Sequence, residues 1–422
     1  MSEQLKVSAD VKRSWPEEGE SRIPYWVYTD EDVYQSELER IWYGDHWSYA
    51  GAECEIPTVG SYRTTTIGER SVILVRSAEN EISVLENRCA HRGVKICQMK
   101  SGKVDNITCP YHQWSYALDG KLQGVPFRRG IKGIGGMPAD FSLSDHGLVR
   151  LKVEVCNGLI WASFGNPPPF REYIGEKLWW SIERIFSGER PLRIVGYNRQ
   201  FIAANWKLII ENIRDNYHGT LLHVFLPTFG LITPNLAAEL RMDETGRHGS
   251  FMAVHADGGG SNNVGQDVLS QTKIDSTWQL ADRRLIETVH ELKGKETAGS
   301  CAVFPSVILL QQINALQLRY IVPKGPHGFD LVWTHFGFED DDDEMRERRV
   351  RHGNLFGPGG LVSVDDSEVL AMVQSGYKME EENGEVVVEM GSGGRESNEE
   401  SNMATETGIR GMYQYYREVM GL

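Results

Sequence analysis

CAHRG (89–93) and CPYHQWSY (109–116) are the two stretches that decide the fold of this chain. Each offers one thiolate and one imidazole, and the four donors in order are Cys89, His91, Cys109 and His112. Structural zinc sites more often pair cysteine with cysteine and histidine with histidine within each short motif. One cysteine and one histidine in each of two loops suits a [2Fe–2S] cluster, in which two cysteines hold one iron and two histidines hold the other. A structural zinc site is the alternative, and the motif favours the cluster by about ten to one.

Short β-rich runs surround these two motifs. We expect strands at SVILV (71–75), at ISVLEN (82–87), around 111–118 and along LVRLKVEVCNGLIWASF (148–164). Before them, TDEDVYQSELERIWYGDHW (29–47) predicts a helix that is capped by Thr29. GNPPPF (165–170) can continue neither a strand nor a helix, so it marks a boundary. The patterns predict a helical N-terminal part over 1–46, a β-rich domain over 47–165 and a larger domain over 166–422.

The larger part of the chain mixes helices with longer strands. VILLQQINALQLRYIV (307–322) and DLVWTHFGF (330–338) predict neighbouring antiparallel strands. The acidic run 339–344 predicts a solvated turn, and the stretch 378–402, rich in Glu, Gly and Ser, predicts an exposed loop. GIRGMYQYYREVMGL (408–422) predicts an amphipathic helix that ends the chain.

Composition excludes several classes of protein. The chain has 422 residues and a formal net charge of −15, which disfavours non-specific binding to nucleic acid or to an anionic membrane. It has no run of 18 apolar residues and no apolar leader at its N-terminus. Six cysteines in a chain of this length do not make a disulfide scaffold. We expect a cytoplasmic protein that binds neither nucleic acid nor membrane.

A second group of metal-binding residue types lies in ENIRDNYHGTLLH (211–223). The stretch predicts a helix, on which Asp215 and His218 share a face. His218 and His223 are five residues apart, about 140° around an ideal helix, so they converge only if the helix is broken or bulged. Gly219 is placed to allow such a break. Two histidines and a carboxylate form the facial triad that leaves open positions on Fe(II).

The carboxylate of this triad must come from another segment. VSVDDSEV (362–369) offers Asp365, Asp366 and Glu368. Taken alone, a histidine pair at this spacing more often consists of two buried histidines whose hydrogen bonds are satisfied within the core, and it binds no metal. Its combination with a cluster motif about a hundred residues upstream favours a metal site, because a cluster and an open iron site together serve an O2-activating enzyme.

The four motifs CAHRG, CPYHQWSY, ENIRDNYHGTLLH and SVDDSE occur in the order and spacing of one family. The chain resembles, over nearly its whole length, the large (α) subunit of Rieske non-haem iron aromatic-ring-hydroxylating oxygenases. The resemblance implies an α+β fold, in which a β-rich Rieske [2Fe–2S] domain is inserted into a helix-grip catalytic domain with a curved antiparallel sheet. It implies that the cluster is held by Cys89, His91, Cys109 and His112. It also implies that the mononuclear Fe(II) is held by His218, His223 and Asp366.

The resemblance assigns two further residues and the partners. Asp215 would be the carboxylate that links an iron-bound histidine to a Rieske histidine of the neighbouring subunit, and so relays electrons. Asn212 would approach the iron as a distant or missing ligand. Family members usually form trimers, α3 or α3β3 with a small β subunit, and receive electrons from a ferredoxin that an NAD(P)H-dependent flavoprotein reductase reduces. We expect the same partners here, with O2 as co-substrate.

The substrate expectation comes from a closer likeness to one branch of the family. GVPFRRGIKG, GGMPADFSLSDHGL and the C-terminal RGMYQYYREVMGL are similar to the branch that acts on benzoates, namely salicylate hydroxylases, anthranilate dioxygenase and terephthalate dioxygenase. An aromatic carboxylate needs a cationic partner in a mostly apolar pocket. Arg319 is the candidate, on the same side of its predicted strand as Gln317 and Ile321. The alternative for Arg319 is a place on a solvated sheet face.

Met403 narrows this expectation further. The terephthalate branch carries a second arginine at the position that Met403 occupies here. With Arg319 alone, a second carboxylate would be left unpaired at a cost of several kcal/mol. We therefore expect hydroxylation of an ortho-substituted monocarboxylate, either salicylate or anthranilate.

Other functions stay open at this point. A dioxygenase acting on terephthalate or another benzoate is one, and a Rieske monooxygenase acting on a non-aromatic alkyl ammonium substrate is another, whose pocket would need aromatic or acidic residues. A Rieske electron carrier would hold two irons per chain where the oxygenase holds three. A zinc-stabilised binding protein would be colourless and contain no acid-labile sulfide.

Overall fold

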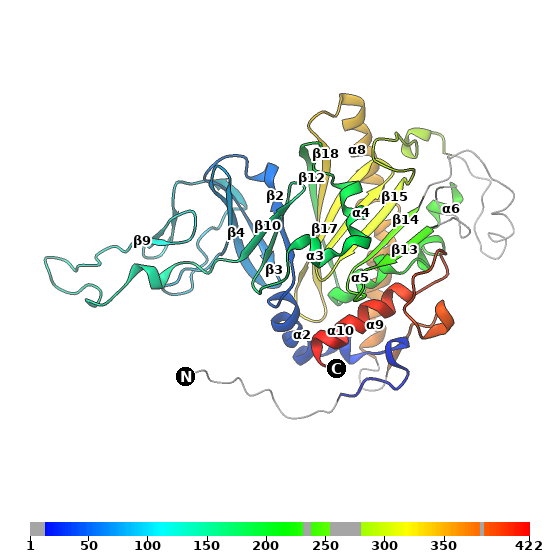
Figure 1. Ribbon diagram of the computed structural model, residues 1–422, viewed down its shortest axis with the longest axis horizontal. Helices are drawn as coiled ribbons and strands as arrows, with labels where there is room; N and C mark the ends of the chain where they lie inside the picture. Colours follow the sequence, from blue (N-terminus) through cyan, green and yellow to red (C-terminus); the bar gives the residue numbers. More distant parts are fainter. Residues whose placement is uncertain (1–12, 230, 232–237, 254–279, 380–383) are drawn as a thin grey trace.

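The computed structural model describes residues 13–229, 231, 238–253, 280–379 and 384–422. The β-rich part of the chain lies at the left of Figure 1, in blue to cyan, and a larger part of mixed helices and strands lies at the right, mostly in green to red. The N-terminal helices are blue in the figure but pack in the core of the larger part. The β-rich part is therefore inserted into a mixed α+β domain, which confirms the expected fold class.

Two short helices precede the β-rich part. They are α1 (Trp26–Thr29) and α2 (Glu31–Glu37), and a π-helical turn over Leu38–Trp42 follows them. Asp30 caps α2, because its extended backbone lets its carboxylate accept two backbone N–H groups of the first turn. The predicted cap at Thr29 is wrong, since Thr29 is already the last helical residue of α1.

The β-rich part consists of short strands in three antiparallel sheets, with the orders β10-β11-β2, β5-β4-β3-β6 and β7-β8-β9. The strands are β2 (Ser48–Ala52), β3 (Ser61–Ile67), β4 (Arg70–Ala78), β5 (Glu81–Glu86), β6 (Ser101–Lys103), β7 (Ile107–Thr108), β8 (Ser115–Tyr116), β9 (Leu122–Gly124), β10 (Lys152–Cys156) and β11 (Leu159–Ser163). The strands expected at 71–75 and 82–87 correspond to β4 and β5. The expected run 148–164 divides into β10 and β11, because Asn157 and Gly158 both take positive φ and form a tight turn.

The larger part is built on a seven-stranded antiparallel sheet in the order β12-β18-β17-β16-β15-β14-β13. Along the chain these strands are β12 (Leu192–Ile202), β13 (Ala238–Met242), β14 (Gly249–Ala253), β15 (Ala298–Val303), β16 (Val307–Gln312), β17 (Ala315–Pro323) and β18 (Phe329–Phe338). The single strand expected over 307–322 is wrong, because Ile313 takes a φ of 56° where the chain turns between β16 and β17. The expected antiparallel neighbour is β18, which pairs with β17.

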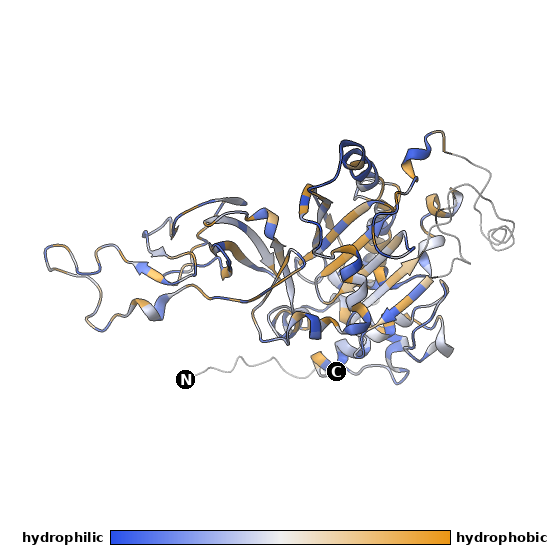
Figure 2. Cartoon of the chain, turned by 45° about the horizontal axis from the view of Figure 1, so that its top comes forward, coloured by the Kyte–Doolittle hydropathy of each residue, from blue (hydrophilic) through white to orange (hydrophobic). Residues whose placement is uncertain are grey.

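Helices cover both faces of this sheet. On one face, α3 (Phe170–Ile174) and α4 (Glu176–Ile185) pack together with β2 and β11 of the β-rich part. On the other face, α5 (Trp206–Arg214), α9 (Ser363–Tyr377) and α10 (Thr407–Met420) pack together with α1 and α2. Figure 2 shows many hydrophobic residues along the strands of the sheet, as burial on both faces requires. The amphipathic C-terminal helix is confirmed as α10.

A buried ion pair joins α2 to this second face. Lys207 Nζ lies 2.6 Å from Glu37 Oε1, and both side chains are fully buried. Glu37 also accepts hydrogen bonds from Trp206 Nε1 (2.7 Å) and from the Tyr416 hydroxyl (2.6 Å). Removing one partner of such a pair typically lowers the free energy of unfolding by about 3–5 kcal/mol, because the other charge is left buried and unpaired. The N-terminal helices are thereby held to α5 and α10.

The acidic run 339–344 begins as the solvated turn that its composition predicts, but it leads directly into a helix and contains one buried residue. Asp342 caps α8 (Asp343–Leu355) by accepting a backbone N–H of the first turn. Asp341 is buried and accepts a hydrogen bond from Arg349 Nη2 (2.9 Å). Burial of this carboxylate is possible because the arginine compensates its charge.

The stretch 378–402 is also more ordered than expected. Its strand β19 (Glu385–Val387) pairs antiparallel with β1 (Arg22–Pro24), and residues 380–383 lie outside the described chain. Arg410, which is fully buried, donates hydrogen bonds to backbone carbonyls of Val388 and Met390 just beyond β19. This arginine ties the stretch to α10.

Candidate metal centres and active site

The two cysteine–histidine loops have the same backbone turn. The N–H of Cys89 and that of Cys109 each donate to the carbonyl five residues later, at 2.9 and 2.8 Å. The N–H four residues after each cysteine donates back to the cysteine carbonyl, at 2.9 Å from Gly93 and 3.0 Å from Gln113. Both of these residues take positive φ, 71° and 57°. A positive φ is unusual for glutamine, so the turn that Gly93 makes without strain is imposed on Gln113 by its surroundings.

In the two loops the cysteines and the histidines differ in their burial, and the two histidine rings are brought close together. Cys89 and Cys109 are buried, whereas His91 is exposed. The centroids of the His91 and His112 rings lie 4.7 Å apart, and His91 stacks on Trp114 at 4.6 Å. His112 Nδ1 is buried and has no hydrogen-bond partner in the described chain, which is expected of a nitrogen that binds a metal. The donors therefore fit a cluster with two thiolates on its buried side and two imidazoles on its outer side.

Tyr116 is a contact that the sequence did not reveal. Its hydroxyl lies 3.1 Å from Cys89 Sγ and accepts a hydrogen bond from the backbone N–H of Ala90 at 3.2 Å. The hydroxyl proton is therefore free to point at the sulfur. A hydrogen bond to a cluster thiolate stabilises the more negative, reduced cluster and raises its potential. The only signal in the sequence is that this tyrosine ends the second motif.

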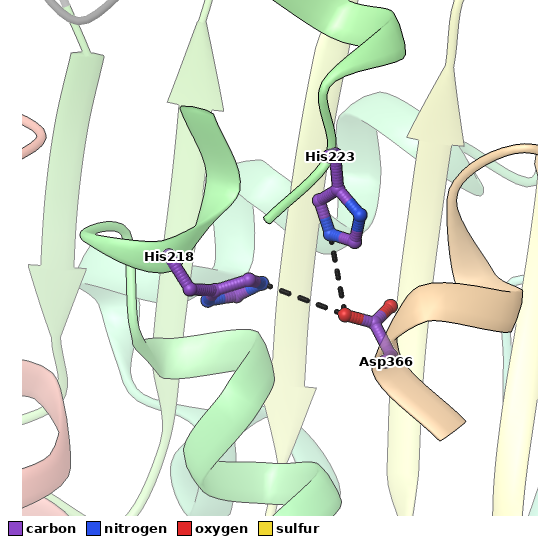
Figure 3. Close-up of side chains that lie close together, drawn as sticks. All are labelled: His218, His223 and Asp366. Carbon is purple, nitrogen blue, oxygen red and sulfur yellow. Dashed lines mark ion pairs between the residues drawn. The ribbon is translucent and has the colours of Figure 1, made fainter. Parts of the chain in front are cut away.

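His218, His223 and Asp366 come together in the larger part (Figure 3). Their donor atoms all lie within 4.8 Å of one another, and no other such group of three occurs among the residues that the structure describes. Asp366 Oδ1 lies 3.2 Å from His223 Nε2 and 3.6 Å from His218 Nε2. Two imidazole nitrogens and one carboxylate oxygen that converge in this way suit Fe(II) and leave coordination positions for O2.

The chain reaches this arrangement by leaving the helix earlier than expected. Helix α5 ends at Arg214, so the helix that was predicted to reach His218, with a break or bulge at Gly219, ends four residues too early for that prediction. Asp215 has an extended backbone, and its carboxylate accepts the N–H groups of Tyr217 (2.7 Å) and His218 (3.3 Å). This local turn competes with the helix. Gly219 lies inside a short 3-10 turn over 218–220 and is not the point of the break.

Asp215 and Asn212 both contact the three converging residues. Asp215 Oδ2 lies 3.1 Å from His218 Nδ1, although the two residues no longer share a helix face. Asn212 Nδ2 donates to Asp366 Oδ1 (3.0 Å) and lies 3.3 Å from His218 Nε2. The structure thus brings Asn212 and Asp215 to His218, His223 and Asp366, whereas Glu368, the third carboxylate that the sequence offered, is not part of this group.

The charges of this group are coupled. Burial raises the pKa of Asp366, but hydrogen bonding to His223, the charges of His223 and His218, and the Asn212 hydrogen bond outweigh it, so the net pKa is lowered. Burial lowers the pKa of His218, but the hydrogen bond and charge of Asp215 outweigh it, so the net pKa is raised. An ionised carboxylate among imidazoles is a favourable place for a cation, which displaces the histidine protons when it binds.

Arg319 lies close to this centre and not on a solvated sheet face. It is 4% exposed, lies over the Trp333 ring at 3.7 Å, and has no hydrogen-bond partner for its Nε. Its Nη2 makes long contacts with Gln317 Oε1 (3.3 Å) and with Ser363 Oγ (3.3 Å), in the first turn of α9. Burial lowers the pKa of Arg319 to about 9, and only the charge of Asp366 opposes this. The guanidinium is therefore desolvated without a carboxylate of its own.

Met403 is buried beside the histidine loop. Its Cε would lie 3.9 Å from a Cβ placed on Gly219, the residue after His218. It belongs to an apolar cluster with Leu226 and Phe356. The position where a related branch carries an arginine is therefore apolar here.

Comparisons with known proteins agree with this geometry. Residues 46–135 match the Rieske [2Fe–2S] domain, and residues 173–422 match the ring hydroxylating alpha subunit (catalytic domain). The large oxygenase component of a salicylate 5-hydroxylase from Ralstonia sp is 48% identical, and 96% of each chain is covered. Subunit alpha 2 of the terminal oxygenase component of a terephthalate 1,2-dioxygenase from Comamonas sp is 38% identical, with 96% of this chain and 97% of that one covered. The large subunit of an anthranilate 1,2-dioxygenase from Burkholderia cepacia is 36% identical, with 96% of each covered.

The fold is also found among solved structures. A naphthalene 1,2-dioxygenase from Rhodococcus sp. bound to indole superposes with a TM-score of 0.77 at 24% identity, and 94% of each chain is covered. Within the described residues, no helix has the length and apolar character needed to span a membrane.

Proposed function

Since this chain belongs to the family of ring-hydroxylating oxygenase large (α) subunits, we propose that it hydroxylates an ortho-substituted benzoate, salicylate or anthranilate. It is a Rieske non-haem iron oxygenase that carries a [2Fe–2S] cluster and a mononuclear iron and uses O2. The observation that carries the substrate proposal is Arg319, a buried guanidinium that lacks a carboxylate partner.

The donor geometry supports a proposal for the metal ligands. We assign the Rieske cluster to Cys89, His91, Cys109 and His112. We assign the mononuclear iron to His218, His223 and Asp366. The cluster supplies electrons one at a time, and the iron, when bound, activates O2. For the domains we propose a Rieske domain over 47–165 and a catalytic domain over 166–422 that is completed by residues 1–46.

Arg319 supports an anionic substrate. A desolvated cation is costly unless an anion pairs with it, and a carboxylate can accept two parallel N–H bonds from a guanidinium. Its unpartnered Nε and weakly engaged Nη2 are the two donors that such an arrangement uses. Met403 supports one carboxylate over two, because a second would face an apolar side chain without a cation. The similarity to a salicylate 5-hydroxylase component points the same way.

Electron supply and assembly are further parts of the proposal. We propose that the protein works in the cytoplasm with a ferredoxin and an NAD(P)H-dependent flavoprotein reductase, as a homotrimer α3 or with a small β subunit as α3β3. Electrons would pass from the His112 side of one subunit to Asp215 and His218 of the next. A loop that follows β9 and extends away from the body of the chain (Figure 1, left) supports this assembly. It exposes apolar side chains among cations, which are Phe127, Arg128, Arg129, Ile131, Lys132 and Ile134.

The histidine loop offers a matching surface. Tyr217, Leu221 and Val224 are exposed there, between and beside the iron histidines, and Asp215 adds a partly exposed carboxylate. Apolar groups gathered on a surface mark a contact site. An apolar loop with cations on one copy and an apolar surface with an acid on another are complementary, and a contact of this head-to-tail kind closes into a ring.

The experiment that tests the substrate is turnover of anaerobically purified protein with a matched ferredoxin and reductase. The substrates are salicylate, anthranilate, benzoate and terephthalate, with products identified by mass. We expect hydroxylated salicylate or catechol from anthranilate, and little product from terephthalate. The variant Met403→Arg should shift relative turnover toward terephthalate. Oxygen consumption without product on all four compounds would reject the roles of Arg319 and Met403 and leave the metal ligands standing.

A further inference from the structure

The geometry points to Asp365 as a positioning residue that accepts a hydrogen bond from Nδ1 of His223, while its neighbour Asp366 lies on the Nε2 side of the ring, where the iron would bind. Asp365 Oδ2 lies 3.5 Å from His223 Nδ1, and Asp366 Oδ1 lies 3.2 Å from Nε2 of the same ring. Both acids lie in the first turn of α9. The first turn of α9 thus places one carboxylate near each of the two ring nitrogens of His223. The inference rests on the proposed ligand set and is independent of the substrate.

Helix geometry explains why two consecutive acids take different roles. Successive side chains on a helix point about 100° apart. Asp366 points inward and is 5% exposed, whereas the side chain of Asp365 is 36% exposed. An exposed carboxylate has the freedom to move the few tenths of an ångström that separate 3.5 Å from a normal hydrogen bond.

His223 needs such a partner. Its side chain is 6% exposed, and its Nδ1 is buried without a hydrogen-bond partner in the described chain. When Nε2 binds a metal, the ring proton must sit on Nδ1, and that N–H requires an acceptor. Asp365 supplies the carboxylate that lies nearest to that nitrogen.

The other iron histidine is supported in the same way. His218 Nδ1 lies 3.1 Å from Asp215 Oδ2, so each imidazole is backed by its own carboxylate. The two carboxylates have different origins, because Asp215 belongs to the histidine loop and Asp365 to α9. Asp365 therefore couples the orientation of His223 to the helix that also supplies Asp366.

The test is the affinity of the full-length protein for Fe(II). The cluster-loaded protein, stripped of mononuclear iron, is titrated anaerobically with Fe(II) against a competing chelator, and cluster iron is subtracted from the acid-labile sulfide content. Loss of a group that accepts the hydrogen bond of a metal-bound histidine typically lowers metal affinity by about 10–100-fold. We expect Asp365→Ala to weaken Fe(II) binding by about that factor, and Asp365→Asn to weaken it less because the amide oxygen still accepts a hydrogen bond.

A matched control separates this role from helix stabilisation. Asp343 occupies the first turn of α8 as Asp365 occupies that of α9, and its side chain is fully exposed. Asp343→Asn removes the same favourable charge at a helix N-terminus without touching an imidazole. It should bind Fe(II) like the unmodified protein. A loss equal to that of Asp365→Asn would overturn the inference.

Two further readouts keep the inference distinct from the ligand assignment. The EPR spectrum of the Fe(II)–nitric oxide complex should become broader or more rhombic in Asp365→Ala, because His223 is less firmly oriented. Asp366→Asn should abolish Fe(II) binding. If Asp365→Asn abolishes binding while Asp366→Asn retains it, Asp365 is the ligand and the positioning role is rejected. If Asp365→Ala leaves both affinity and spectrum unchanged, the positioning role is rejected and the ligand set stands.

Discussion

The two metal centres of this protein are built in opposite ways. The proposed cluster donors come from two loops with the same backbone turn, in which Cys89 and Cys109 make equivalent hydrogen bonds at nearly equal distances. The proposed iron donors come from the segment after α5 and from the first turn of α9, and only the packing of these segments brings His223 to Asp366. The first centre is a local structure that is presented by a small β-rich part. The second is a tertiary structure that exists only when the larger sheet is covered by its helices.

The largest effect is expected from a substitution that interrupts electron transfer between the cluster and the mononuclear iron. At saturating Fe(II), which compensates any weaker binding of iron, Asp215→Ala should keep both metal sites loaded and lower turnover by more than about 100-fold, because the bridge to His218 is removed. Iron, acid-labile sulfide and steady-state oxygen consumption measure this. Since Asp215 also shapes the loop, Asp215→Asn is the companion variant, which keeps the acceptor oxygen for the backbone N–H groups. Normal turnover in both variants would reject the electron relay.

The second largest effect is expected on substrate binding near the mononuclear iron site, with no effect on the cluster. Arg319→Gln should lower kcat/KM for a benzoate by about 100-fold, which corresponds to the loss of about 3 kcal/mol from a buried charge-assisted contact. Most of the change should lie in KM. The visible spectrum of the cluster should not change, because Arg319 lies in the other domain. Arg346→Gln, on the exposed face of α8, is the matched control, and an unchanged KM in Arg319→Gln would contradict the carboxylate contact.

A pH dependence should also separate the two regions. Burial raises the pKa of Glu211, under the iron centre in α5, to about 7, and the Tyr413 hydrogen bond that opposes it is too weak to restore the usual value. A raised carboxyl pKa means that the folded protein holds a proton that the unfolded chain releases near pH 4.5. The contribution of Glu211 to stability is therefore full below that pH and is lost as the pH rises through about 7.

Glu211→Gln tests this dependence directly. The variant keeps the hydrogen-bonding shape without the charge, so relative to the unmodified protein it should gain about 3 kcal/mol between pH 5 and pH 8. Urea unfolding that is followed by far-UV circular dichroism measures the difference at each pH. A difference that does not change with pH would show that Glu211 titrates normally.

The smallest effect is expected on the reduction potential of the Rieske cluster. Tyr116→Phe should lower the reduction potential of the cluster by about 40 mV, which is the one-electron equivalent of one hydrogen bond of about 1 kcal/mol to the Cys89 sulfur. Redox titration that is followed by the visible spectrum measures this shift. Iron binding at the mononuclear site should stay the same. An unchanged potential would mean that the Tyr116 proton points elsewhere.

The difference between the centres also explains which parts of the structure could be predicted. CAHRG and CPYHQWSY carry their own geometry, so the cluster donors were recognisable from spacing and residue type alone. Two features there were not foreseen, namely the positive φ of Gln113, which resembles that of Gly93 in the first loop, and the contact of Tyr116 with Cys89. In the larger part, the helix that was expected to break only at Gly219 ends at Arg214, and the single strand expected over 307–322 is two strands. Hydrophobic periodicity does not register a turn made by Asp215 or by Ile313, because neither is glycine or proline.

The amino-acid sequence by itself determined the family and the division into a β-rich part and a mixed part, and it indicated the residues that we propose as ligands of the two metal centres. Short motifs hold these features because a ligand must have a particular chemistry at a particular spacing. The family resemblance pointed to Asp366, and the tertiary structure places that residue, not Asp365, within the group of three donors. The tertiary structure alone decided that Arg319 is buried without a carboxylate and that Met403 lies beside Gly219. Those facts depend on how α9 and the histidine loop pack on one face of the sheet, and packing between distant segments leaves no periodic signal in the chain.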